Sequence, residues 1–212
     1  MRKVLASTFV SLDGVMQAPG GPDEDRTGGF SHGGWIVPYG DESIGAAIGE
    51  LFAAPFDLLL GRRTYDIFAA YWPHFKVDPV ADPLSVGAEN IARQFNRVTK
   101  YVATHSPDTL TWNNSQGLGA DVPAAIRELK RGDGPDLLIQ GSSELVQLLL
   151  AQDLIDEMRL LIYPIVLGRG KRLFGPEAMP TAFRLTQSVT SGTGVLLTTY
   201  QRAGKVQTSS LA

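Results

Sequence analysis

Three short segments place hydroxyl residues, together with glycine or with basic residues, where a predicted strand gives way to a loop or a helix. Residues 60–65 are Leu-Gly-Arg-Arg-Thr-Tyr, residues 102–107 are Val-Ala-Thr-His-Ser-Pro, and residues 139–145 are Ile-Gln-Gly-Ser-Ser-Glu-Leu. Glycine lets the backbone approach a ligand closely, and the free N–H groups at a helix start bind anions. Each segment alone is more simply explained as a turn, a cap or a solvated surface. Together they favour a phosphorylated ligand with several anchor points, such as a dinucleotide.

The rest of the sequence carries little chemistry of its own. The 212 residues include no cysteine and three separated histidines, so thiolate chemistry is excluded and a multi-histidine metal site is disfavoured. A formal net charge of −3 disfavours a nucleic-acid binder. Neither G-x-G-x-x-G nor G-x-x-x-x-G-K-[ST] occurs, so a standard Rossmann fingerprint or P-loop does not explain the three segments. An enzyme with this composition needs a bound molecule to supply the reactive atom, and we expect no metal.

The elements that must position these segments alternate along the chain. Helices between strands predict right-handed crossovers and a largely parallel sheet, and the last two strands predict an antiparallel hairpin. We expect strands at 4–10, 56–60, 100–104, 136–139, 158–166, 183–190 and 195–200. We expect helices capped by Asp41, Thr64 and Asp121, a weaker helix over 84–95, and a helix from Ser142 to Leu150. The prediction is one α/β domain over residues 1–203 with a polar tail at 204–212. With no leader-like segment or apolar span, we expect a cytoplasmic protein.

A glycine- and proline-rich stretch at residues 13–40 has no regular pattern. So long a segment inside a compact domain is usually a binding loop or disordered. Its aromatic residues Phe30, Trp35 and Tyr39 argue against disorder. Trp35 and Tyr39 could also stack on a flat heteroaromatic substrate.

Four motifs in chain order resemble a known family. They are Ser-Leu-Asp-Gly at 11–14, the segment at 60–65, Gly-Ser-Ser-Glu-Leu at 141–145, and Pro-Ile-Val-Leu-Gly-Arg-Gly-Lys-Arg-Leu-Phe at 164–174. Together they resemble the dihydrofolate-reductase-like superfamily, and more closely its branch with the C-terminal reductase domain of the bifunctional riboflavin-biosynthesis deaminase-reductase. The resemblance implies a single three-layer domain with a mixed, mostly parallel sheet of about eight strands. It also implies an NADPH-dependent reductase that is often a homodimer.

The resemblance assigns cofactor roles by position. Residues flanking the nicotinamide would be Ser7, Asp13, Gly14 and Val15. Residues holding the cofactor phosphates would be Gly61, Arg62, Arg63 and Thr64. Residues at the adenosine ribose and its 2′-phosphate would be Thr104, His105 and Ser106. Residues passing under the pyrophosphate would be Ile139, Gln140, Gly141, Ser142, Ser143, Glu144 and Leu145. Arginine and histidine donors suit a 2′-phosphate, whereas an acidic ribose ligand would have suggested NAD.

The catalytic position departs from the dihydrofolate reductases, which place a substrate-binding carboxylate on the helix that precedes the second strand. Counted back from Gly61 without gaps, that position is Gly45. Asp41 and Glu42 lie about one turn earlier and could substitute, although Asp41 is equally well explained as a helix N-cap. Asp13 is a further catalytic candidate, and a turn aspartate before Gly14 is the plainer interpretation.

The sequence-based hypothesis is an NADPH-dependent reductase acting on a pyrimidine- or pterin-like substrate. The favoured activity is that of a 5-amino-6-(5-phosphoribosylamino)uracil reductase. The alternatives are dihydrofolate reduction, a non-catalytic NADP-binding protein and a purely structural interaction module. Lys171 and Arg172, with Arg169 beside them, could bind a substrate or cofactor phosphate, or form a solvated basic loop.

Overall fold

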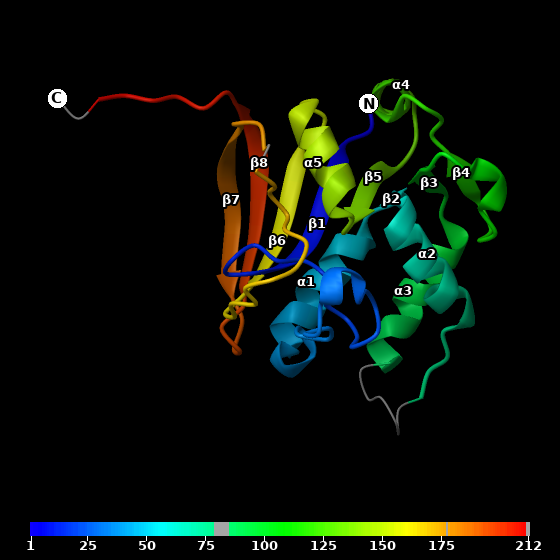
Figure 1. Cartoon of the computed structure of the whole chain (residues 1–212), viewed down its shortest axis with the longest axis horizontal. Helices are drawn as coiled ribbons and strands as arrows, with labels where there is room; N and C mark the ends of the chain where they lie inside the picture. Colours follow the sequence, from blue (N-terminus) through cyan, green and yellow to red (C-terminus); the bar gives the residue numbers. More distant parts are fainter. Residues whose placement is uncertain (79–84, 177, 211–212) are drawn as a thin grey trace.

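One mixed sheet forms the centre of the molecule. The computed structural model describes residues 1–78, 85–176 and 178–210, and over these ranges the sheet has eight strands in the order β4-β3-β2-β5-β1-β6-β8-β7 (Figure 1). The strands are β1 (Val4–Ser11), β2 (Phe56–Gly61), β3 (Lys100–Ala103), β4 (Ser115–Gly117), β5 (Asp136–Gln140), β6 (Glu157–Tyr163), β7 (Ala182–Thr190) and β8 (Leu196–Gly204). The first six strands in chain order pair in parallel, whereas β8 pairs antiparallel with β6 and β7. The predicted mixed sheet and C-terminal hairpin are confirmed.

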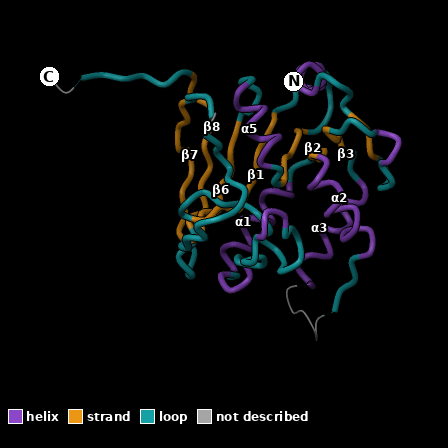
Figure 2. Tube along the Cα trace, viewed as in Figure 1, coloured by secondary structure: helices purple, strands orange, loops and turns teal. Residues whose placement is uncertain are grey.

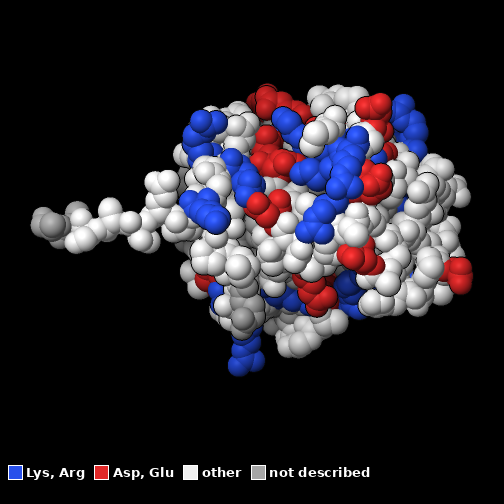
Figure 3. Space-filling view, turned by 90° about the horizontal axis from the view of Figure 1, so that it is seen from above, with Lys and Arg blue, Asp and Glu red and all other residues white. Residues whose placement is uncertain are grey.

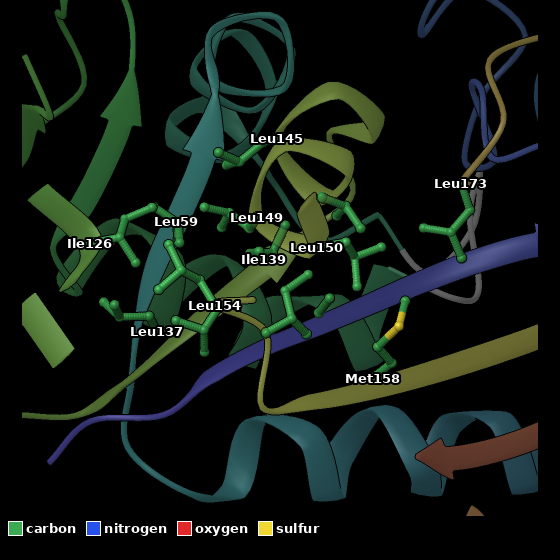
Figure 4. Close-up of a cluster of buried hydrophobic side chains, with 14 of the residues drawn as sticks. Leu59, Ile126, Leu137, Ile139, Leu145, Leu149, Leu150, Leu154, Met158 and Leu173 are labelled. Atoms are coloured by element: carbon green, nitrogen blue, oxygen red, sulfur yellow. The ribbon is translucent and has the colours of Figure 1, made fainter. Parts of the chain in front are cut away.

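Helices cover both faces of this sheet, which gives three layers (Figure 2). The five α-helices of the described residues are α1 (Glu42–Ala53), α2 (Arg62–Tyr71), α3 (Ser85–Arg97), α4 (Val122–Arg131) and α5 (Ser143–Ala151). Side chains of α4 and α5, including Ile126 and Leu149, pack with Leu137 and Ile139 of β5 in one core (Figure 4). Alternate residues of β2 and β5 point the other way, into a second core with the first three helices.

Several predicted boundaries were wrong for identifiable reasons. The second helix starts at Arg62 with Gly61 as N-cap, so Thr64 lies inside the helix and does not cap it. Strand β6 ends at Tyr163 because Pro164 follows and has no N–H for the ladder. Strand β8 includes Gly204, and residues 205–210 then leave the sheet (Figure 1). Leu84, the predicted start of the third helix, lies outside the described residues, and the short polar strand β4 was missed for lack of an apolar pattern.

The 13–40 segment is ordered by its own small core, as its aromatic residues indicated. Phe30 and Trp35 are each 5% exposed and pack in one cluster with Val15 and Tyr163. The Trp35 indole donates to the Gln17 carbonyl oxygen at 2.8 Å. Short 3-10 turns at Thr27–Gly29 and Val37–Tyr39 complete the loop. The loop therefore has a defined shape that can form one wall of a site.

The face of the molecule seen from above carries no large patch of a single charge sign (Figure 3). Lysine and arginine side chains there lie beside aspartate and glutamate side chains (Figure 3), in keeping with the small net charge. Within the three described ranges, no helix is both long and apolar enough to cross a membrane.

Candidate functional site

A cavity of about 2280 Å³ lies where the three predicted segments meet. Such a volume exceeds the roughly 300–1,000 Å³ of a typical small-ligand pocket, so it can hold a dinucleotide beside a substrate. The carboxyl ends of β2, β3 and β5 form one side, which we call the junction edge: residues 61–64, 104–106 and 140–145. Residues 16–25 of the long loop and one face of α1 form other walls. Parallel strands place their carboxyl ends together, and ligands of open α/β sheets bind there.

Backbone geometry brings two of the junctions into contact. A Cβ built on Gly61 would lie 2.0 Å from Ser142 Oγ, so only glycine fits at the end of β2. Gly141 has φ +77° and Ser142 has φ +75°, a left-handed conformation that is costly for serine. Strained backbone of this kind concentrates at ligand sites. The prediction that residues 61 and 141–142 act together is consistent with this contact.

The helices that follow β2 and β5 differ in their caps from α1 and α4. Asp41 and Asp121 cap α1 and α4 by accepting backbone N–H groups at 2.9 Å. Gly61 and Ser142, the N-caps of α2 and α5, make no side-chain cap hydrogen bond. The first N–H groups of α2 and α5 are therefore not taken by a cap. A helix start in this state attracts an anion through its N–H groups and its dipole.

Arg62 links the first junction to the second. Its guanidinium donates to Thr104 Oγ1 at 3.3 Å and to Thr109 Oγ1 at 2.5 Å, and it pairs with Asp66 at 2.9 Å. Thr104, His105 and Ser106 line the cavity beside it. The structure thus groups a guanidinium, an imidazole and hydroxyls at the cavity. Their predicted role at the adenosine ribose and its 2′-phosphate stays a prediction.

Arg63 and Lys171 have a different arrangement, because both pair with a buried carboxylate that the sequence analysis missed. Asp25 accepts from Arg63 at 3.1 Å and from Lys171 at 2.7 Å, and its side chain is 7% exposed. Burial opposes ionisation, but hydrogen bonds from Lys171 and Thr27 outweigh it and lower the pKa of Asp25 to about 2. This clasp holds the long loop against α2 and the 171–173 segment, and it uses two cations that were predicted to contact phosphate.

Asp13 does not line the cavity but joins two loops beside it. Its carboxylate accepts from Ser11 Oγ at 2.6 Å and from the backbone N–H groups of Leu167 and Gly168 at 3.1 and 2.9 Å. Burial alone would raise the pKa of Asp13, but these hydrogen bonds outweigh it and lower the pKa to about 2. Arg172 donates to the Asp13 carbonyl oxygen. The hydrogen bonds of Asp13 and Arg172 therefore stabilise the contact between the two loops.

Of the other residues predicted to flank the nicotinamide, Ser7 lines the cavity, whereas Gly14 and Val15 do not. Ser7 lines the cavity and is 5% exposed. Gly14 and Val15 do not line it, because the chain turns away after β1 and Val15 is buried in a bridge with Arg172. Ile139 is likewise a core residue, whereas all six residues from Gln140 to Leu145 line the cavity.

The two predicted carboxylates at the start of α1 also lie off the cavity. Asp41 caps the helix through Ile44 N, and this hydrogen bond, aided by Thr193, lowers the pKa of Asp41. Glu42 is exposed and Gly45 does not line the cavity. The cavity-facing stripe of α1 is instead Ser43, Ala46, Ala47, Glu50 and Leu51, whose spacing of three and four a helical wheel could have shown. Glu50 is the carboxylate that α1 offers.

Of the predicted stacking residues, Trp35 is a core residue and Tyr39 is a half-buried residue that packs against the same core. Trp35 packs edge-on against Tyr163 with ring centroids 5.3 Å apart, and Tyr39 does the same at 5.6 Å. Neither lines the cavity. Sequence analysis assigned them to substrate because a buried aromatic in a loop has the same local signature as a stacking platform.

The eight-stranded mixed sheet, its helices on both faces and the cavity at its carboxyl edge define a dihydrofolate-reductase-like α/β domain. The structure resembles dihydrofolate reductase from Enterococcus faecalis complexed with NADP(H), with a TM-score of 0.56 and 13% identity over 95% of this chain and 96% of that one. The model of the RibD C-terminal domain matches residues 2–197. The chain belongs to this family.

The chain is also similar to a curated protein in sequence and to a further solved structure in fold. The uncharacterized protein YyaP of Bacillus subtilis strain 168 is 22% identical over 203 residues, which is 96% of each chain. A diaminohydroxyphosphoribosylaminopyrimidine deaminase/5-amino-6-(5-phosphoribosylamino)uracil reductase from Thermotoga maritima matches with a TM-score of 0.58 and 16% identity. That match covers 95% of this chain and 57% of the Thermotoga chain.

Proposed function

We propose that the protein is an NADPH-dependent reductase that transfers hydride to a C=N or C=O carbon of a pyrimidine- or pterin-like substrate. Within that class, the activity we favour is one similar to 5-amino-6-(5-phosphoribosylamino)uracil reduction. The carrying observation is that three strand ends with phosphate-binding character line one cavity, beside two helices that begin without side-chain caps. Family membership and the named reductases among its structural neighbours support the proposal.

The residues present fit a phosphorylated dinucleotide. Gly61 and Gly141 leave the backbone accessible, the starts of α2 and α5 supply N–H donors, and Arg62 with His105 would hold a 2′-phosphate. When bound, NADPH supplies the hydride. The protein binds and orients the two reactants, and the Asp25 clasp fixes the long loop as one wall of the cavity.

Of the described carboxylates that line the cavity, Asp23, Asp25, Asp66 and Glu157 form ion pairs, and Glu144 belongs to the junction edge. Glu24 in the long loop and Glu50 on α1 are left as candidate proton donors to the substrate. Burial raises the pKa of Glu24, although backbone N–H groups of Gly20 and Gly21 partly oppose this. A general acid works best with a pKa near the working pH. Glu24 is therefore the stronger candidate, and Glu24→Gln should lower turnover more than Glu50→Gln and remove one limb of the pH profile of kcat.

The test is oxidation of NADPH in the presence of dihydrofolate, other pterins and aminopyrimidine ribosyl phosphates. We expect turnover with a pyrimidine or pterin, and the panel shows whether dihydrofolate is among the substrates. Saturable NADPH binding without turnover on the whole panel would instead support a non-catalytic NADP-binding protein. An absence of NADPH binding at millimolar concentration would contradict the proposal.

A further inference from the structure

A row of polar side chains crosses five neighbouring strands at one level of the sheet. Gln140 of β5 pairs with Ser7 of β1, Ser7 with Arg159 of β6, Arg159 with Thr199 of β8, and Thr199 with Gln187 of β7. Directly paired residues on adjacent strands project to the same face. All five residues line the cavity, so they form a continuous floor that we call the polar row.

On one side the polar row adjoins an apolar cluster on the same face. Two residues further along the strands, Phe9 pairs with Leu161 and Leu161 with Leu197, and these pack in a cluster with Ile44 and Ile48 of α1. Polar groups in such a setting are costly unless they have partners. Within the described residues, Gln140 Nε2 is buried and has no hydrogen-bond partner. A ligand oxygen is the partner that this donor lacks.

Arg159 is the charged member at the centre of the row. Its Nε donates to Glu157 Oε1 at 2.8 Å, and the Glu157 side chain is only 10% exposed, so the guanidinium is anchored on one edge. No hydrogen bond to another described residue engages its two terminal nitrogens. A guanidinium carries five N–H donors in a fixed fork that matches carboxylate and phosphate oxygens. Arg159 thus presents its free edge to the cavity.

Exposure increases along the polar row from Ser7 to Gln187, and Gln140 at the other end is half-buried. Ser7 is 5% exposed, Arg159 and Thr199 are half-buried, and Gln187 is exposed. Four strand spacings of about 4.8 Å separate Gln140 from Gln187, so the row is roughly 19 Å long. The buried end adjoins the junction edge, and the exposed end opens at β7. A ligand on this floor has its ring at the buried end and a polar arm directed toward solvent.

We propose that Arg159 binds an anionic group, a phosphate or a carboxylate, on the polar arm of the substrate. Gln140 Nε2 donates to an oxygen of the substrate ring, and Glu157 orients the guanidinium. The placement of the ring rests on the proposed function, whereas the anion site rests on the polar row itself. Substrates of this site are therefore oxygen-rich heterocycles with an acidic substituent.

The test compares anionic probes with their uncharged counterparts by isothermal titration calorimetry. Uridine 5′-phosphate against uridine is the phosphate arm, and orotate against uracil is the carboxylate arm. We expect the unmodified protein to bind one anionic probe about 10–100-fold tighter than its counterpart, the range of a charge-assisted hydrogen bond. The pair of probes that shows this difference in affinity identifies the bound anion as a phosphate or a carboxylate.

Arg159→Ala should bring the ratio close to one, and Arg159→Lys should restore part of it. Arg159→Gln keeps much of the side-chain volume and replaces Arg159→Ala if the latter fails to fold. The matched control is Arg127→Ala, an exposed arginine on α4 that bonds Gln152 at 2.8 Å and does not line the cavity. A ratio near one on both arms for the unmodified protein, or a ratio that survives in Arg159→Ala, would overturn the proposal.

A parallel NADPH titration separates this inference from the proposed function. Arg159→Ala should keep the NADPH affinity of the unmodified protein. If the protein binds an anionic probe through Arg159 but does not bind NADPH, the reductase proposal fails and the anion site stands. If NADPH binds and the probes show no dependence on Arg159, the anion site fails alone.

Discussion

The junction edge and the polar row line the same cavity but differ in what they are made of. At the junction edge, contacts depend on the main chain: Gly61 and Gly141 carry no Cβ, and α2 and α5 begin without side-chain caps. On the polar row, contacts depend on side chains held by sheet register, with Arg159 anchored by Glu157. A main-chain site is damaged by adding atoms, whereas a side-chain site is damaged by removing them. A main-chain site therefore suits a cofactor, whereas a side-chain site suits the selection of a particular substrate.

The largest effect is expected from adding one carbon to the junction edge. In Gly61→Ala the new Cβ lies 2.0 Å from Ser142 Oγ and 3.2 Å from Ser142 Cβ, so the serine hydroxyl must turn away and the start of α5 must shift slightly. Overpacking of this kind costs about 1–3 kcal/mol, and we expect NADPH affinity to fall about 100-fold, measured by quenching of tryptophan fluorescence. Adding Ser142→Gly removes the opposing hydroxyl at a position with φ +75°, so the double variant should recover most of the affinity. Normal affinity in Gly61→Ala would contradict the close contact.

The next effect concerns the clasp that joins Asp25 of the long loop to Arg63 of the junction edge and to Lys171. The pKa of Asp25 is lowered to about 2, so its stabilisation is present above its unfolded pKa near 4 and is lost as pH falls toward 2. Asp25→Asn should lower the free energy of unfolding at pH 7 by about 2 kcal/mol. Its stability should also depend less on pH between 4 and 2, since only groups such as Asp13 still contribute there. Urea unfolding at several pH values measures this, and equal slopes for both proteins would refute the ion-pair role.

A smaller effect should distinguish the 2′-phosphate from the rest of the dinucleotide. Arg62 lies against Thr104 at the second junction, so Arg62→Ala should weaken NADPH about tenfold and NADH little. Arg63→Ala should change the two affinities equally, because Arg63 pairs with Asp25. Calorimetric titration of both cofactors provides the comparison. Equal losses for NADPH and NADH in Arg62→Ala would remove the 2′-phosphate assignment.

The smallest effect is expected away from both regions. Gly45 lies in α1 with open space around the position of a Cβ and does not line the cavity. Gly45→Ala should raise the free energy of unfolding by about 0.5–1 kcal/mol, because alanine favours the helix, and should leave NADPH affinity unchanged. Thermal unfolding and the fluorescence titration test both parts. A loss of affinity would mean that α1 contacts the cofactor at this position.

The sequence was most informative where function depends on the main chain. Gly61, Gly141 and the hydroxyls around them are visible as motifs, and the structure brings them together on one cavity. The alternation of apolar runs and helix caps predicted the mixed sheet for the same reason, since these patterns are local.

Features that depend on long-range register could not be found in this way. Ser7 and Arg159 are 152 positions apart, and only the pairing of β1 with β6 makes them neighbours. Asp25, which clasps two cations from distant segments, also has no local signature. Asp13, Asp41 and Trp35 had the residue types of a site, but their hydrogen bonds and packing occupy them elsewhere. The position of a residue at a strand end therefore predicted its place in the cavity better than its residue type did.

The most direct measurement of the central claim is hydrogen–deuterium exchange of the unmodified protein with and without saturating NADPH. The account predicts that NADPH slows amide exchange in all three segments of the junction edge, 61–64, 104–106 and 140–145, while α4 is unchanged. Protection confined to one segment, or exchange that NADPH does not alter, would contradict a dinucleotide held across the three strand ends.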